Sequence, residues 1–414
     1  MPAVLLAAFS IEALLGAVLR LLNLAHARRH GAEVPDEFAG EVNAETLART
    51  LAYSGERMRL GLLQYVLGNG LLAAVLFAGL LGAYDRFVQA HVSSFIGSGV
   101  VFFMGLNFVT LLCAVPFDLY THFSVEQRHG FNRMSFGLWC GDFVKGLFLS
   151  ALLTGAAAAA ALALIAHFPD LWWLLVWLFF SAFELLLLYA SPYLIEPLFQ
   201  RMKPLAVPEL GAEVRALCER SGVHVSRILE VDASRRSSHS NAYFTGIGRV
   251  KRVVLFDTLL ARMTHREILA VLAHELGHWK KHHVLMRLIV TELSSLLIAY
   301  AAFRLLAWGE LGHWVGLEQA SLPARIVVVA FLGSMCLFPL TPLLSYWSRR
   351  HEWQADRFAR ELTRDPESLA SALSKLARDN LSNLHPHPLY AAFYYSHPLP
   401  SARVAALRSR APAS

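Results

Sequence analysis

The stretch HELGH, residues 274–278, carries the residue types most suited to chemistry, because two histidines flank a glutamate. In a helix, His274 and His278 lie one turn apart on the same face, where both imidazoles can bind one metal ion. Glu275 is rotated by about 100° from His274, so its carboxylate can lie beside the metal and accept a proton from water. The spacing therefore predicts a zinc site with Glu275 as a general base.

A helix through this motif has a recognisable start, because Thr264 and Glu267 form the sequence pattern of a capping box. The alternative is that the H-E-x-x-H pattern occurs by chance in a histidine-rich chain. Its residues would then simply be exposed residues of a helix. The small or apolar neighbours Ala273, Leu276 and Gly277 favour a buried helix instead. Burying two histidines and a glutamate without a partner would cost several kcal/mol, so the motif favours a bound metal.

A catalytic zinc site needs a third protein ligand and leaves one position for water. The stretch RRHEWQADRFA, residues 349–359, offers Glu352 and Asp356, which share one face of a helix. We expect Glu352 to ligate zinc and Asp356 to accept a hydrogen bond from a ligand histidine. A solvated, charged helix end is the alternative interpretation of this stretch.

Membrane helices must position these residues, because 56% of the 414 residues are hydrophobic and only 16% are charged. A spanning helix needs about 20 mainly apolar residues. Seven stretches qualify: 3–24, 60–84, 95–117, 146–167, 171–195, 284–307 and 324–347. The 4 cysteines lack CxxC spacing, so we expect buried thiols. The net charge of +6 comes without a basic run interleaved with aromatic residues, which argues against a nucleic-acid partner.

Arginine and lysine alternate between the segments that connect these stretches. They are frequent after the first, third and seventh stretches and throughout 196–283, and scarce around 85–91, 167–170 and 310–318. The positive-inside rule therefore predicts an external N-terminus and a cytosolic C-terminus. The apolar beginning of the chain is interpreted as a retained first transmembrane helix, because it lacks a basic region and a clear cleavage site.

The chain is accordingly divided into four parts. Residues 1–195 hold transmembrane helices one to five, and 196–283 form a cytosolic catalytic segment with the zinc-binding helix. Residues 284–347 hold helices six and seven, and 348–414 form a cytosolic segment that completes the zinc site. The run KKHH, residues 280–283, is interpreted as an interfacial anchor.

Within the cytosolic segment we expect a helix near 208–221 and short strands in RILEVDAS (227–234) and RVKRVVLFDTLL (249–260). SSHSNAYFTGIG (237–248) predicts a further strand that leads into a glycine-containing hairpin turn. An extended peptide could add to this strand at the edge of a sheet, with Asn241 holding one amide. An ordinary surface hairpin is the alternative.

HELGH, the distant E-x-x-A-D of residues 352–356 and the seven apolar stretches together resemble the type I CAAX prenyl protease family, which are integral-membrane zinc metalloproteases. Other segments similar to that family stand in its order: FSVEQRHGFNRMSFGLWCGDFVK, YLIEPLFQRMKPL, RSSHSNAYFTGIGRVKRVVLFDTLL and YYSHPLPSAR. The resemblance implies a mainly α, multi-spanning membrane protein. Its seven transmembrane helices would form a barrel around a large aqueous chamber, capped by a cytosolic α+β zinc metalloprotease domain with a short edge-strand sheet.

The resemblance also implies roles for matching residues. It makes His274, His278 and Glu352 the ligands of one zinc ion and Glu275 the general base. It further assigns Asn241 to the substrate backbone, His397 to the scissile carbonyl and its oxyanion, and Arg403 to substrate binding. One departure is His387, at a position where the family commonly has aspartate.

These observations favour an integral-membrane zinc endopeptidase with a peptide or protein substrate. The resemblance implies that this substrate is an isoprenylated CAAX protein or peptide, cut near its C-terminus. A membrane-protein quality-control protease without a prenyl requirement is one alternative. A seven-helix transporter or receptor with a regulatory zinc is another, although a regulatory site has no need of Glu275. The arginine- and alanine-rich composition favours a bacterial inner membrane over an endoplasmic reticulum membrane.

Overall fold

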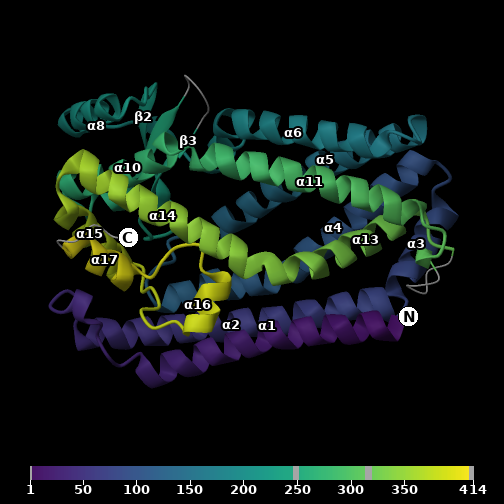
Figure 1. Cartoon of the computed structure of the whole chain (residues 1–414), viewed down its shortest axis with the longest axis horizontal. Coiled ribbons are helices and arrows are strands. Elements are labelled where there is room, and N and C mark those ends of the chain that lie inside the picture. Colours follow the sequence, from purple (N-terminus) through teal and green to yellow (C-terminus); the bar gives the residue numbers. More distant parts are fainter. Residues whose placement is uncertain (1, 246–250, 313–318, 410–414) are drawn as a thin grey trace.

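The computed structural model describes residues 2–245, 251–312 and 319–409 as long helices with a smaller α/β part at one end (Figure 1). In these residues, 7 helices or helix pairs are long and apolar enough to cross a membrane. They are α1 (Pro2–His30), α2 (Ala44–Phe77), α4 (Phe95–Tyr120), α5 (Phe136–His167), α6 (Trp172–Leu194), α11 (His283–Ala307) and the pair α13 (Leu322–Leu337) and α14 (Thr341–Thr363). The predicted helical, multi-spanning membrane fold is confirmed.

The predicted second stretch, 60–84, has the wrong bounds. Helix α2 begins far earlier, where the side chain of Asn43 caps the backbone N–H of Thr46, and it ends at Phe77. Gly79 then adopts a left-handed φ of 79°, which ends the helix and lets the chain turn into α3 (Leu80–His91). The apolar pattern continues through this turn, so hydropathy alone could not detect it.

The predicted seventh stretch, 324–347, is also not one straight helix. A short 3-10 turn (Phe338–Leu340) separates α13 from α14, and prolines lie at 339 and 342. Helix α14 then continues past the apolar stretch to Thr363, which carries Glu352 beyond the apolar part of the helix into the α/β part.

Alanines on α5 leave space between the membrane helices. Ala157, Ala158 and Ala161 line an apolar cavity of about 760 Å³ together with Phe180 of α6 and Ala302 of α11. A π-helical segment (Thr121–Glu126) follows α4, and one turn of helix, α7 (Glu196–Phe199), follows α6. The large aqueous chamber implied by the family resemblance stays a prediction.

The α/β part contains a sheet in the order β1-β2-β4-β3, so the third strand lies at an edge as predicted. The strands are β1 (Met202–Pro204), β2 (Arg227–Val231), β3 (Ala242–Thr245) and β4 (Arg252–Phe256), with β2 and β4 parallel and the other pairs antiparallel. The glycine-containing turn expected at 246–248 lies outside the described residues. The strand expected to continue through DTLL is wrong there, because 257–260 are helical.

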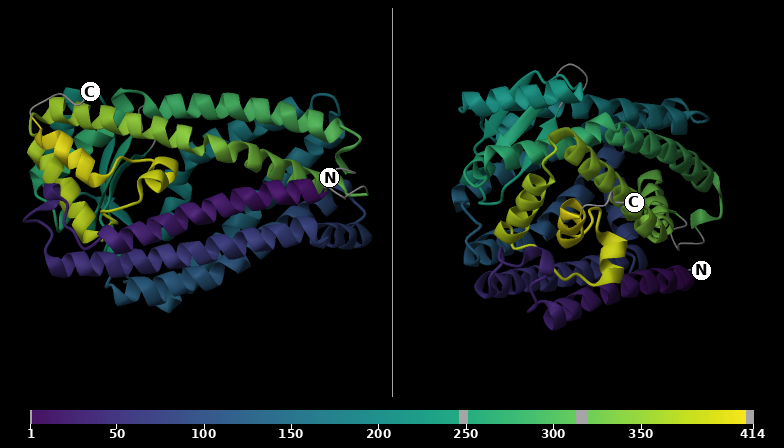
Figure 2. Two further views of the ribbon diagram at one scale, coloured as in Figure 1. Left: turned by 60° about the horizontal axis from the view of Figure 1, so that its bottom comes forward. Right: turned by 60° about the vertical axis from the view of Figure 1, so that its left-hand side comes forward.

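The remaining elements are η1 (Asp36–Phe38), α8 (Pro208–Ser221), η3 (Ala233–Arg235), α9 (Asp257–Leu260), α10 (His265–Lys280), α15 (Pro366–Asp379), α16 (Pro388–Tyr394) and α17 (Pro400–Arg408). The predicted helix at 208–221 is thus confirmed. The C-terminal segment, yellow in Figure 2, folds back along α14, and α16 contacts both α14 and α1. Buried apolar residues of α10, α8, α15 and the sheet form one core.

Candidate metal centre and active site

Helix α10 begins as its sequence predicts. The backbone N–H of Glu267 donates to Oγ1 of Thr264, and the Glu267 carboxylate accepts from the N–H of Thr264 at 2.8 Å. Nζ of Lys375 lies 2.7 Å from the same carboxylate, and Oγ of Ser371 donates to it at 2.6 Å. These contacts anchor the first turn of α10 to α15, so the helix enters the core in a fixed position.

A close helix crossing brings the third predicted ligand to the histidines. Gly277 packs against Ala355 of α14 so closely that a Cβ on the glycine would lie 2.9 Å from Cα of Ala355. Two small residues at the crossing let the backbones approach, and Glu352 lies one turn before Ala355 on the same helix. HELGH (274–278) thereby contributes to the site through the small size of Gly277 as well as through its histidine and glutamate side chains.

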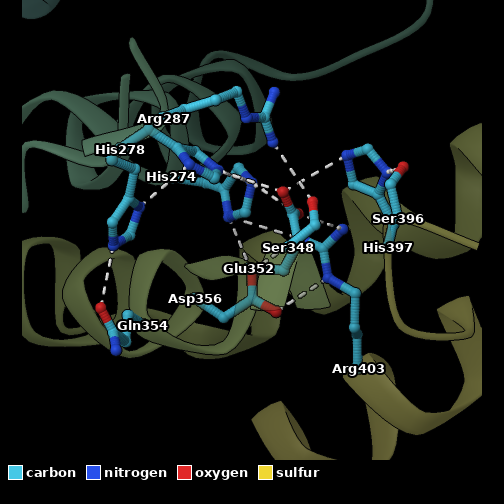
Figure 3. A network of polar contacts seen from close by, with 11 residues as sticks. His274, His278, Arg287, Ser348, Glu352, Gln354, Asp356, Ser396, His397 and Arg403 are labelled. Atoms are coloured by element: carbon cyan, nitrogen blue, oxygen red, sulfur yellow. Dashed lines mark hydrogen bonds and ion pairs between the residues drawn. The ribbon is translucent and has the colours of Figure 1, made fainter. Parts of the chain in front are cut away.

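The structure gathers His274, His278 and Glu352 into one group whose potential ligand atoms all lie within 4.8 Å of one another (Figure 3). The two Nε2 atoms are 3.3 Å apart, and the Glu352 oxygens lie 3.4 Å from Nε2 of His274 and 3.3 Å from Nε2 of His278. Two imidazoles and a carboxylate are a donor set that zinc accepts.

Two further observations fit a cation between these groups. Glu352 is only 4% exposed, and within the described chain its Oε2 atom has no hydrogen bond. Burial and the Arg403 guanidinium lower the pKa of His274, but contacts with Asp356 and Glu352 outweigh both and raise this pKa to about 9. The carboxylates thus create a strongly cation-attracting environment at the His274 ring.

Asp356 contacts the far side of the His274 ring. Its Oδ1 atom lies 2.8 Å from Nδ1 of His274, which leaves Nε2 for the metal position. Arg403, buried to 7% exposure, donates two hydrogen bonds to this carboxylate, at 2.8 Å and 2.6 Å. The guanidinium therefore faces Asp356 and lies 3.7 Å from Glu352.

His397 reaches the site from the loop before α17. Its Nε2 atom lies 3.3 Å from Oε1 of Glu352, and its Nδ1 atom is 3.0 Å from Oγ of Ser396. With a side chain 63% exposed, His397 faces an accessible region rather than the core. Glu275 is partly buried on α10, next to His274. Two potential proton-handling groups thus lie around the three metal-binding candidates.

Asn241 lies at the start of the edge strand β3, which packs against α10. The residue is exposed, and its side-chain oxygen accepts the N–H of Ala242 at 2.9 Å. His387, the residue that departs from the family pattern, lies away from the metal position, where its backbone N–H donates to Asn23 of α1.

The interpretation of 280–283 as an interfacial anchor is wrong for His283. This residue is 3% exposed, and its Nδ1 atom lies 3.1 Å from Nδ1 of His278. Gln354, between Glu352 and Asp356 of α14, lies 2.9 Å from the other ring nitrogen of His283. This contact could not be recognised in the sequence, because His283 is the last of four polar residues. The left-handed His282 (φ 58°) turns the chain and directs His283 inward.

Known proteins share this arrangement of elements. A family described as "CAAX prenyl protease N-terminal, five membrane helices" matches residues 23–201, and "Peptidase family M48" matches residues 204–411. The chain is 34% identical over 339 residues to CAAX prenyl protease 1 of Saccharomyces cerevisiae, covering 77% of this chain and 74% of the yeast protein. It is 31% identical over 378 residues to CAAX prenyl protease 1 homolog of Arabidopsis thaliana, covering 88% of each.

The crystal structure of Ste24p from S. mikatae superposes with a TM-score of 0.88 at 28% identity, covering 98% of this chain and 99% of that one. The likeness includes both the membrane helices and the α/β part, since almost the whole of each chain is covered. The chain therefore belongs to peptidase family M48 and is an integral-membrane metalloprotease.

Proposed function

We propose that the protein is a zinc endopeptidase that cuts near the C-terminus of isoprenylated CAAX proteins or peptides. The observation that carries this proposal is the convergence of His274, His278 and Glu352 at the end of the membrane helices. The relatives named CAAX prenyl protease support the substrate class.

His274, His278 and Glu352 would hold one zinc ion. Such an ion supplies Lewis acidity, which favours the attack of water on a carbonyl carbon. Glu275 accepts the proton of the attacking water and then returns it to the leaving amine. His397, exposed beside Glu352, donates a hydrogen bond to the oxyanion that develops on the scissile carbonyl.

Asp356 and Arg403 act through the ligands. Asp356 accepts the Nδ1–H of His274 and so presents the lone pair of Nε2 to the zinc position. We propose that Arg403 holds Asp356 in position rather than binding the substrate. Its guanidinium is buried and donates two hydrogen bonds to the Asp356 carboxylate. This positioning role replaces the substrate contact expected from the sequence.

The peptide substrate would bind as an added strand along β3. Among the residues that the structure describes, β3 pairs with β4 alone, so its other edge could form backbone hydrogen bonds with an extended peptide. Asn241, exposed at the start of β3, would hold one amide of that peptide. Prenylation would deliver the peptide to the bilayer in which the helices lie.

We further propose that the α/β part faces the cytosol. The arginine-rich connecting segments support this orientation, which follows the positive-inside rule. In this division 1–195 and 284–347 are membrane parts, and 196–283 and 348–414 together build the zinc site. The composition favours a bacterial inner membrane.

A peptidase assay tests the function directly. The purified protein is incubated with a farnesylated C-terminal peptide or its unprenylated twin, each with and without a chelator. We expect chelator-sensitive cleavage of the farnesylated peptide and much slower cleavage of its twin. Equal cleavage of both would instead support a quality-control protease, and no cleavage of either would remove the CAAX assignment.

A further inference from the structure

His278 has a second ring nitrogen that faces neither the metal position nor solvent. This Nδ1 atom lies 3.1 Å from Nδ1 of His283, the first residue of α11. Figure 3 shows His278 and Gln354 within the surrounding network. Of two imidazole nitrogens at this distance, one must donate and the other must accept. The identity of the donor decides whether His278 can bind a metal through Nε2.

The contact between Gln354 and His283 decides which of the two histidines donates the hydrogen bond. Its Oε1 atom lies 2.9 Å from Nε2 of His283, and a carbonyl oxygen only accepts. His283 therefore carries its proton on Nε2 and has a lone pair on Nδ1. It follows that His278 donates Nδ1–H to His283, which leaves the lone pair of His278 on Nε2, facing Glu352 at 3.3 Å.

The opposite orientation of the Gln354 amide would reverse every bond in this chain. The amide would then donate to His283, His283 would donate to His278, and the proton of His278 would occupy Nε2. A ring protonated at Nε2 cannot bind a metal with that atom. Only one direction of the chain from Gln354 to His278 is compatible with the metal site, and the placement of Oε1 of Gln354 against His283 agrees with that direction.

We propose that His283 is a positioning residue that fixes the tautomer and the ring orientation of His278, with Gln354 as the acceptor that fixes His283. The inference rests on the proposed metal site and extends it. His283 accepts the Nδ1–H of His278, as Asp356 accepts the Nδ1–H of His274, and in each case Nε2 is left for the metal. Its own ring is held by parallel stacking on His351, with ring centroids 4.1 Å apart and an interplanar angle of 6°.

Two substitutions of His283 separate hydrogen bonding from packing. His283→Asn places a side-chain oxygen near the position of Nδ1 but removes the ring, so it keeps the acceptor and loses the stacking. His283→Phe keeps the ring against His351 and loses the acceptor. We expect the phenylalanine variant to bind zinc about 10- to 100-fold more weakly than the wild type, the usual cost of losing such a partner, and the asparagine variant to bind more tightly than the phenylalanine variant.

The measurement is the apparent zinc dissociation constant of the purified full-length protein, from competition with a chelator. The visible spectrum of the cobalt-substituted protein, which reports ligand geometry, should change in His283→Phe and resemble the wild type in His283→Asn. The reverse order of zinc affinities would contradict the proposal, because it would mean that His283 contributes only packing. His351→Phe is the matched control and should retain wild-type affinity.

Gln354 gives a second test that does not depend on how the His283 variants fold. Gln354→Glu keeps an acceptor for His283, whereas Gln354→Met has a similar length and no such acceptor. At pH 8 we expect zinc affinity to be retained in the first and reduced in the second. Equal affinities for both would contradict the relay. A wild-type protein that binds no zinc would overturn the proposed metal site and the relay with it.

Discussion

Gly277 of α10 and Ala355 of α14 are in contact at the helix crossing, where a Cβ atom on Gly277 would lie 2.9 Å from Cα and 3.1 Å from the carbonyl oxygen of Ala355. Both neighbouring atoms belong to backbone, so neither can move aside without moving α14. The same crossing sets the distance between the histidines of α10 and Glu352 of α14. Metal affinity should therefore depend on the absence of a side chain at Gly277.

The main expected effect of Gly277→Ala is weaker zinc binding rather than a lower free energy of unfolding. A shift of α14 by a few tenths of an ångström would move Glu352 away from the histidines. Zinc content after dialysis is the measurement. Gly211→Ala in α8 is the control, because an added Cβ there meets its nearest neighbour at 3.9 Å. Equal zinc content in Gly277→Ala and the wild type would contradict the dependence on this crossing.

Removal of the third ligand should abolish zinc binding. Glu352→Ala deletes one of the three donors that lie within 4.8 Å of one another, so we expect it to lose zinc as severely as His278→Ala. Asp356→Ala removes only the partner of His274 and should weaken binding by roughly 10- to 100-fold. Atomic absorption after dialysis decides the order. If Glu352→Ala kept its metal while Asp356→Ala lost it, the two roles would be reversed.

Glu267 should stabilise the fold in a pH-dependent way. Burial raises its pKa, but hydrogen bonds from Lys375, Ser371 and Thr264 outweigh burial and hold the pKa below its usual value of 4.5. A lowered pKa in the folded state means that the stabilisation is complete above pH 4.5 and is lost as the pH falls through the folded-state value.

Glu267→Gln should therefore lower the free energy of unfolding by about 1–2 kcal/mol at pH 7, because it removes a charged partner of Lys375 and weakens the cap. Thermal unfolding in detergent measures the difference from the wild type, which should shrink below pH 4. Glu209→Gln, at an exposed position of α8, is the control and should change little. A difference that is constant between pH 7 and pH 3 would exclude the ionised carboxylate as its cause.

The two ends of the helical bundle should lie on opposite sides of the membrane. Helices α3 and α8 lie at these opposite ends (Figure 1), and Gln89 of α3 and Glu209 of α8 are exposed. In a background without native cysteines, a membrane-impermeant thiol reagent applied to intact cells should label Gln89→Cys and spare Glu209→Cys until the membrane is opened. Labelling of both positions in intact cells would contradict the proposed topology.

Local sequence signals were sufficient for much of the fold and the site. The capping box of Thr264 and Glu267 correctly marks the start of α10, and the short connection between the sixth and seventh apolar stretches implies that these helices are antiparallel neighbours. That relationship was enough to expect Glu352 beside the histidines. These features could be predicted because each depends on spacing within one segment or between adjacent ones.

Turns inside apolar runs, very short strands and contacts between distant residues could not be predicted in this way. The turn at Gly79 interrupts an apolar run that looks continuous, and the strand β1 has only 3 residues. In the sequence His283 is one of several polar residues at a helix end, and its contact with Gln354 joins residues 71 positions apart. The buried pair of Arg403 and Asp356 is likewise formed by residues 47 positions apart.

The central claim is hydrolysis at a metal site with Glu275 as the general base, and Glu275→Gln tests it most directly. The variant keeps the shape of the side chain and all three candidate ligands, so we expect a wild-type zinc content. The measurement is the rate of cleavage of the farnesylated peptide, taken together with the zinc content of the same preparation. The account predicts one zinc ion per chain in both proteins and a loss of nearly all activity in Glu275→Gln. Substantial cleavage by the zinc-loaded variant would contradict it.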